Sequence, residues 1–83
     1  MKYYYNYSEV LTVDLHNMKA WDAWSFLDRF IAFAPKEVGE IIVIHGYNNG
    51  KVLMNMVRKE YKNNRISKKK TDWNAGRTSL ILS

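Results

Sequence analysis

The sequence contains no cysteine. The absence of thiols excludes a disulfide framework and a thiolate metal site. No apolar run approaches the roughly 20 residues that a membrane-spanning helix requires. The first ten residues, MKYYYNYSEV, lack the aliphatic central region of a secretory signal peptide. From these absences we expect a soluble, cytoplasmic protein with no membrane partner.

Proline and glycine are also scarce, with one proline and four glycines. Pro35 follows a helical pattern and predicts its end, because the residue before a proline disfavours helix.

The 83 residues suffice for one small domain, which buries roughly 60% of its unfolded surface. We expect a tyrosine-rich segment at residues 1–8 and a single domain at residues 9–83.

Acidic residues are fewer than basic residues, and the formal net charge is +5. A basic chain favours an anionic partner, and nucleic acid is the commonest one. Many small basic proteins are simply soluble, so charge alone leaves both interpretations open.

The hydrophobic pattern predicts the element order β-α-β-α-β-β. Strands are expected at residues 10–15, 41–44, 65–72 and 77–83, and helices at 20–34 and 51–62. A strand–helix–strand unit implies parallel first strands, and the last two strands are close enough for a hairpin. The expected product is a small α/β sandwich of two or three layers. The run Ile41–Ile44 is typical of a central strand covered on both faces.

Histidines end two of the predicted strands, His16 in VDLH and His45 in IIVIH. The carboxyl ends of parallel strands meet at one sheet edge, where ligands bind in open α/β folds. Either histidine could serve as a general acid or base, or simply cap its strand. Asp14 shares a strand face with His16 and could orient it, position an attacking hydroxyl or recruit a divalent cation. Magnesium or manganese is thus a candidate cofactor, although the spacing of these three residues is not diagnostic of a metal site.

The stretch HGYNNG connects the second strand to the second helix. Glycine and asparagine tolerate positive φ, which lets successive amides turn toward one phosphate at a helix N-terminus. The candidate phosphate-binding residues are Gly46, Asn48, Asn49, Gly50 and the following Lys51. The stretch matches neither of the glycine-rich nucleotide motifs, and a plain turn with a helix cap is the alternative.

A second candidate nucleic-acid surface is a basic zone of Lys68, Lys69 and Lys70 with Arg58, Lys59, Lys62 and Arg65, and Arg77 is a further candidate. These side chains either follow a phosphate backbone or form a solvated edge that discourages aggregation. The tyrosines of residues 1–8 could stack on bases, but we favour contact with the sheet edge, a protein partner or a second copy. Among the tryptophans, we expect Trp24 in the core, Trp21 half-exposed and Trp73 packed beneath the hairpin turn.

Three segments together resemble the Smr domain, the small MutS-related family: VDLHNM, IIVIHGYNNG and WNAGRTSLIL. That family pairs an L-D-L-H-G strand end with an H-G-x-G-x-G loop and closes with N-x-G-x-T-x-x-x-L. The resemblance covers residues 9–83 and implies the same β-α-β-α-β-β fold. It also implies nicking of DNA, cleavage of RNA, or ribosome-linked quality control. The family's motif residues correspond to Asp14, His16, His45, Gly46 and Gly50.

The sequence departs from the family pattern around both motifs. Asn17 and Asn48 replace glycines, and Tyr47 stands where a basic residue is common. Val52 and Leu53 occupy the places of a leucine and an arginine that often follow the loop. Three functions follow: an endonuclease for DNA or RNA, a nucleic-acid-binding module without catalysis, and a protein-interaction domain that uses residues 1–8.

Overall fold

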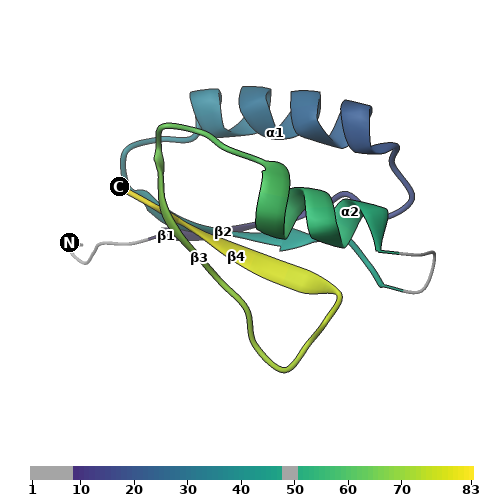
Figure 1. Cartoon of the computed structure of the whole chain (residues 1–83). Helices are drawn as coiled ribbons and strands as arrows, with labels where there is room; N and C mark the ends of the chain where they lie inside the picture. The colour runs from purple at the N-terminus through teal and green to yellow at the C-terminus, as the bar shows by residue number, and fades with distance from the viewer. Residues whose placement is uncertain (1–8, 48–50) are drawn as a thin grey trace.

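The computed structural model describes residues 9–47 and 51–83 (Figure 1). The tyrosine-rich segment and the residues Asn48, Asn49 and Gly50 therefore lie outside the described residues. The elements follow the expected order: β1 (Glu9–Asp14), α1 (Ala20–Phe33), β2 (Val38–Ile44), α2 (Val52–Asn55), η2 (Met56–Glu60), β3 (Ile66–Lys70) and β4 (Arg77–Leu82).

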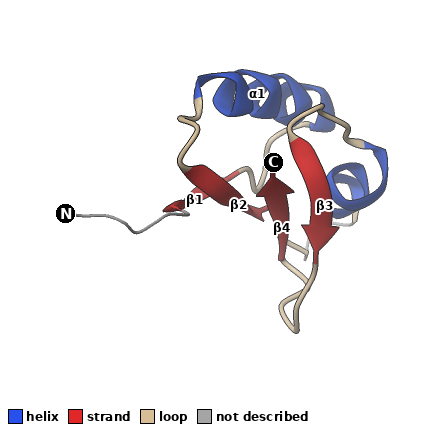
Figure 2. Ribbon diagram, turned by 90° about the vertical axis from the view of Figure 1, so that its left-hand side faces the viewer, coloured by secondary structure: helices blue, strands red, loops and turns tan. Residues whose placement is uncertain are grey.

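The four strands form one mixed sheet in the order β1-β2-β4-β3. β1 and β2 pair in parallel, as predicted from the helix that connects them. β4 pairs antiparallel with β2 on one side and with β3 on the other, so the expected C-terminal hairpin is confirmed. Both helices lie on the same side of this sheet (Figure 2), which makes the fold a two-layer sandwich.

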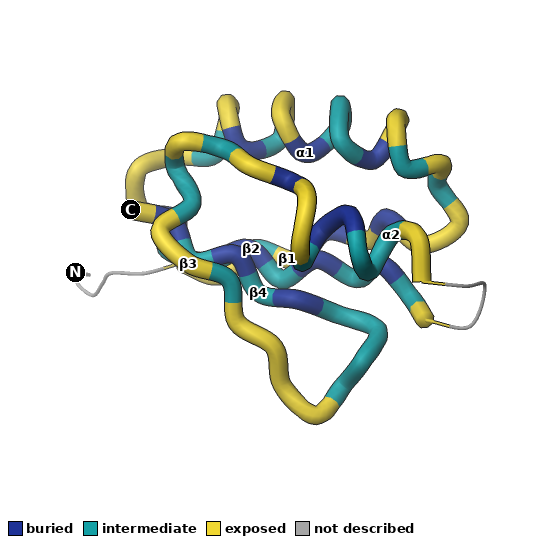
Figure 3. The backbone as a smooth tube through the Cα atoms, in the orientation of Figure 1, coloured by how far each residue is buried: buried dark blue, intermediate teal, exposed yellow. Residues whose placement is uncertain are grey.

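Pairing register assigns each strand residue to one face of the sheet, because directly opposed residues share a face. Val13, Val43 and Thr78 form a row that is buried under the helices. The next row, Asp14, Ile44 and Arg77, therefore lies on the opposite face, which we call the open face. Figure 3 shows the buried positions concentrated between the sheet and the helices.

The expectation that Ile41–Ile44 is covered on both faces is wrong. Ile41 and Val43 are fully buried, whereas Ile42 and Ile44 remain partly exposed on the open face. The described helices cover one face, and they supply the core residues Ala23, Leu27, Ile31, Met56 and Val57. Four successive β-branched residues carry no alternation, so the sequence could not reveal which face is covered.

The second helix is not the uninterrupted α-helix predicted at residues 51–62. One α-helical turn passes into a π-helical turn, in which the amide of Tyr61 donates to the carbonyl of Met56 at 2.7 Å. Tyr61 is fully buried, and its hydroxyl donates to Asp28 on α1 at 2.7 Å. Its ring also meets Trp24 edge to face, with centroids 5.1 Å apart. This π-helical end thus joins the second helix to the first.

The C-terminus of α1 is closed by a side chain from a distant segment. Ala34 already has an extended backbone, as expected for the residue before Pro35. The guanidinium of Arg65 donates to the carbonyls of Ile31 and Ala34 at 2.7 and 2.9 Å. These contacts satisfy carbonyls that a helix end leaves unpaired.

Within the described residues, no helix is long and apolar enough to span a membrane.

Two of the three tryptophans are more exposed than the sequence predicts. Trp24 packs against the core as expected, but Trp21 is 81% exposed rather than half-exposed. Trp73 is 85% exposed, so the prediction that it packs beneath the hairpin turn is wrong. The β3–β4 loop extends away from both helices, and no helix lies against it (Figure 1).

Candidate functional site

Asp14 and His16 form a directly bonded pair at the carboxyl end of β1. The backbone amide of His16 donates to Asp14 Oδ1 at 3.0 Å, and His16 Nδ1 lies 2.5 Å from the same oxygen. A carboxylate only accepts hydrogen bonds, so Nδ1 carries the proton and Nε2 is the ring atom able to take another. The side chains are 54% and 51% exposed for His16 and Asp14, respectively, so both can reach a ligand.

The ionised form of Asp14 is favoured by this pairing. Its pKa is lowered from the ordinary value mainly by the hydrogen bond from the His16 side chain. The hydrogen bond from the His16 backbone amide acts in the same direction. A charged Asp14 can therefore orient the imidazole at neutral pH, as the sequence suggested.

Tight backbone geometry brings the two predicted histidine segments together. Asn17 has φ of 70° and Gly46 has φ of 79°, both in the left-handed region. A Cβ added at Gly46 would lie 3.4 Å from the Cβ of His16. The Leu15 amide also donates to the Ile44 carbonyl at 2.7 Å, which extends the pairing of β1 with β2 past the strand end. His16 and the residues after β2 thus form one edge, as parallel pairing predicted.

His45 occupies a different environment, because it is 3% exposed and faces the helices. Its Nδ1 lies 2.9 Å from the carbonyl of Gly46, which can only accept, so Nδ1 carries the proton. Its Nε2 lies 2.8 Å from the Thr78 hydroxyl, and Arg58 Nε donates to that hydroxyl at 2.8 Å. The consistent arrangement is a chain in which Arg58 donates to Thr78, Thr78 to His45, and His45 to Gly46.

Burial and charge both favour the neutral form of His45. Removal of the imidazole from water is the main cause that lowers its pKa, and the positive charge of Arg58 contributes further. The hydrogen bond to the Gly46 carbonyl opposes this shift. Arg58 is itself fixed, since its Nη2 also donates to the carbonyl of Arg77 at 3.0 Å. His45 is therefore a buried neutral linker between the second helix, β4 and the loop after β2.

The β3–β4 loop closes against the same segment. The amides of His45 and Gly46 both donate to the Gly76 carbonyl at 2.9 Å. A Cβ added at Gly76 would lie 3.7 Å from the Gly46 Cα and 3.2 Å from Asn74 Oδ1. A side chain at Gly76 would therefore crowd Asn74 within the loop, whereas its distance from Gly46 is an ordinary van der Waals contact.

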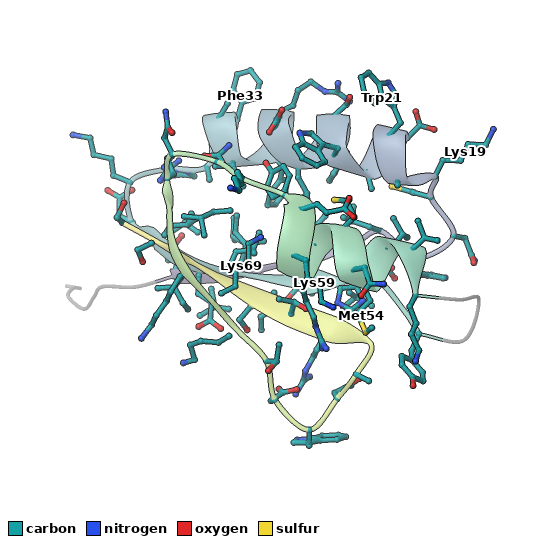
Figure 4. All side chains as sticks on the ribbon, in the orientation of Figure 1. Lys19, Trp21, Phe33, Met54, Lys59 and Lys69 are labelled. Carbon is teal, nitrogen blue, oxygen red and sulfur yellow. The ribbon has the colours of Figure 1, made fainter. Side chains whose placement is uncertain are left out.

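A cleft of about 790 Å³ opens at this edge of the sheet. Both histidines contribute to its wall, together with Asn17, Met18, Lys19, Ala20, Ile44, Gly46, Tyr47, Val52 and Leu53. Lys19 lies at the start of α1, where its side chain extends outward (Figure 4). Lys51 Nζ lies 5.5 Å from the ring centroid of Tyr47. Lys19 was not predicted from the sequence, because a single lysine before a helix carries no distinctive signal.

The predicted basic surface is divided between the two faces of the sheet. Lys68 and Lys70 pair with Ile81 and Ser79 on the open face, where Arg77 also lies. Lys69 pairs with buried Leu80, and its Nζ donates to the Tyr61 carbonyl at 2.5 Å. Desolvation, followed by the charge of Lys62, lowers the pKa of Lys69. Arg58 and Lys69 thus belong to internal contacts, and the predicted set is not one surface.

The described residues do not assemble the loose metal site suggested by the sequence. Asp14 and His16 meet, but both nitrogens of His45 are engaged with Gly46 and Thr78. Across residues 9–47 and 51–83, no group of three histidine, aspartate or glutamate side chains could hold a metal ion.

The comparisons with known proteins agree with the fold. The family model of the Smr domain matches residues 13–78, which include Asp14, His16, His45 and Thr78. A search of curated proteins gave no match. The crystal structure of the Smr domain of Thermus thermophilus MutS2 superposes with a TM-score of 0.77 at 18% identity. That superposition covers 88% of this chain and 98% of the MutS2 domain chain, and it shows a shared fold. The chain therefore belongs to the Smr domain family, a family of nucleic-acid-associated modules.

Proposed function

We propose that this Smr domain is an endonuclease that hydrolyses phosphodiester bonds in DNA or RNA. The observation that carries the proposal is the exposed Asp14–His16 pair, of which His16 lines the cleft. Asp14 fixes the proton on His16 Nδ1 and aims Nε2 outward, which is the arrangement that a general base requires. His16 is the proposed catalytic residue, and Asp14 is its positioning residue.

The reaction requires that one proton is removed from the attacking nucleophile and that one is delivered to the leaving oxygen. His16 Nε2 accepts a proton from an attacking water as its oxygen forms a bond to phosphorus. The bond from phosphorus to the leaving oxygen breaks, and that oxygen receives a proton from the imidazolium or from solvent. A positioned general base contributes typically 10² to 10⁴-fold in rate. Lys19 and Lys51 flank the cleft and supply positive charge for the phosphate.

His45 has a supporting role in this proposal. Its buried ring connects Thr78 to Gly46, and Gly46 lies against His16. Loss of the His45 side chain would therefore disturb the wall of the cleft and the fold. The two histidines are equivalent candidates in the sequence, but in this proposal His16 is the base and His45 supports the fold around it.

The test incubates the purified protein with supercoiled plasmid and, separately, with a labelled hairpin RNA. Each reaction is run with magnesium, manganese or EDTA, beside the His16→Ala variant. Asp22→Asn, at a position exposed on α1, serves as a matched control. We expect cleavage by the parent and by Asp22→Asn, with a loss of 10² to 10⁴-fold for His16→Ala. Equal cleavage by folded His16→Ala would refute the proposed role of His16.

A second candidate is a binding module without catalysis, favoured by the exposed cations Lys68 and Lys70 on the open face. Its affinity should fall with salt, with a log–log slope of about −0.7 to −0.9 for each phosphate neutralised. The double charge reversal Lys68→Glu and Lys70→Glu should weaken binding to every sequence. Lys36→Glu, exposed in the α1–β2 connection, controls for a general charge effect.

A further inference from the structure

Trp73 is an indole displayed to solvent on the loop between β3 and β4. It is 85% exposed, which is unusual for the side chain with the largest apolar surface. The loop extends away from both helices (Figure 1). In a small domain with a limited core, such placement withholds a large apolar group from the interior. The exposed Trp73 ring is therefore available to pack against a ligand.

Hydrogen bonds within the loop hold Trp73 in place. The Asn74 amide donates to Asp72 Oδ1 at 2.8 Å, and the Gly76 amide donates to Asn74 Oδ1 at 2.8 Å. The Gly76 carbonyl then accepts from the amides of His45 and Gly46. The loop is thus braced internally and anchored at the cleft, so less ordering is required when a ligand binds.

Arg77 completes a platform with Trp73. Its guanidinium carbon lies 5.5 Å from the indole centroid. Its Nε and Nη2 donate to Asp72 Oδ2 at 3.1 and 2.8 Å, which fixes the guanidinium. These donors hold the carboxylate ionised, and hydrogen bonding by Arg77 is the main cause that lowers the pKa of Asp72. A fixed guanidinium beside an indole is a suitable surface for a flat aromatic ligand.

The platform shares the open face with the Asp14–His16 pair. Asp14 pairs with Ile44 in β2, and Ile44 pairs with Arg77 in β4, so one row connects them. Two inter-strand spacings place the Cα atoms of Asp14 and Arg77 about 10 Å apart. Lys70 follows in the next row, opposite Ser79, and Lys68 follows opposite Ile81. These lysines supply exposed positive charge on the same face of the sheet as Arg77.

We propose that Trp73 stacks on an unpaired base of the nucleic acid whose phosphate reaches the Asp14–His16 pair. The backbone of the bound strand passes Lys68 and Lys70 on the open face. The indole can stack only on a base whose face is accessible. Within a continuous duplex, each base is already stacked between its neighbouring base pairs. The preferred substrate is therefore a single strand, or a duplex with unpaired nucleotides near the cleaved bond. This inference deepens the proposed function, on which it rests.

The test measures binding rather than cleavage, by anisotropy of labelled single strands of about 12 nucleotides, of RNA and of DNA, in EDTA. A blunt duplex of the same sequence is measured in parallel. The variants are Trp73→Ala and Trp73→Phe, with Trp21→Ala as the matched control because Trp21 is 81% exposed on α1 (Figure 4). We expect Trp73→Ala to weaken single-strand binding roughly 5- to 150-fold. Trp73→Phe should retain most of the affinity, and Trp21→Ala should match the parent.

Each alternative result has a distinct meaning. Equal single-strand affinity of Trp73→Ala and the parent would overturn the stacking platform while leaving cleavage by His16 untouched. Equal weakening of single-strand and duplex binding by Trp73→Ala would also overturn it, because a stacked base would not explain that loss. Trp73-dependent binding without any cleavage would support the platform and refute the nuclease. Failure of the parent to bind any probe would overturn the platform, whereas the separate cleavage assay decides the nuclease.

Discussion

His45 Nε2 lies 2.8 Å from the hydroxyl of Thr78, a residue 33 positions later in the chain. This contact connects the end of β2 to β4 inside the protein, where His45 is 3% and Thr78 is 1% exposed. Arg58 donates to the same hydroxyl from the second helix. One threonine oxygen therefore satisfies a buried imidazole and a guanidinium at the same time.

Replacement of Thr78 by valine should destabilise the protein. Valine keeps the shape but removes the hydroxyl, and it leaves buried polar atoms of His45 and Arg58 without their partner. The expected loss in the free energy of unfolding is about 1 to 3 kcal/mol. Urea denaturation of Thr78→Val, beside Thr12→Val at an exposed β1 position, measures it. Equal midpoints for the two variants would show that the buried chain of hydrogen bonds contributes nothing.

The stability of the fold should depend on the protonation of His45. Because the folded-state pKa is lowered below 6.5, the unfolded chain binds the proton more readily. This contribution to stability is fully present above about pH 6.5 and is lost as the pH falls toward the lower folded-state pKa. Urea denaturation at pH 7.5 and 5 should show this loss in the parent and a smaller one in His45→Asn. The same pH dependence in both proteins would contradict the assignment.

Loss of the charge on Asp14 should slow cleavage without loss of fold. Asp14→Asn removes the carboxylate that holds the proton on His16 Nδ1, so the imidazole is no longer fixed in its productive orientation. We expect kcat to fall about 10²-fold with little change in KM. Steady-state kinetics on the cleaved substrate give both constants, and circular dichroism checks the fold. A change confined to KM would mean that Asp14 contacts the substrate rather than orienting His16.

Removal of the Arg65 side chain should weaken the end of α1. Arg65→Ala leaves the carbonyls of Ile31 and Ala34 without their charged donor. Hydrogen bonds to charged groups typically contribute about 1.5 to 3 kcal/mol, and part of this is recovered by water at the surface. Thermal denaturation should show a lower Tm for Arg65→Ala than for Lys36→Ala, an exposed position just beyond the helix. Matching Tm values would assign no role to the cap.

Much of the fold was predictable because it depends on local pattern. The strand–helix–strand order placed His16 and His45 at one sheet edge, and both contribute to the cleft. The end of α1 followed from Pro35. The resemblance of the motifs to the Smr domain was confirmed over residues 13–78.

The parts that sequence reasoning missed depend on contacts between distant segments. The sequence does not reveal that His45 is buried and bonded to Thr78, nor that Arg58 donates to the same threonine hydroxyl. The π-helical turn depends on the burial of Tyr61 against α1, which no helical period reveals. The exposure of Trp73 depends on the direction of the β3–β4 loop, which extends away from both helices (Figure 1) and which the sequence does not reveal.

The most direct measurement is chemical rescue of His16→Ala by added imidazole in a single-turnover cleavage assay. His16 is half-exposed, so free imidazole can enter its place and act as the base, whereas the site of His45 is closed to solvent. We expect imidazole to restore part of the rate to His16→Ala and none to His45→Ala. Parental activity in folded His16→Ala, or rescue confined to His45→Ala, would contradict the proposal that His16 is the base.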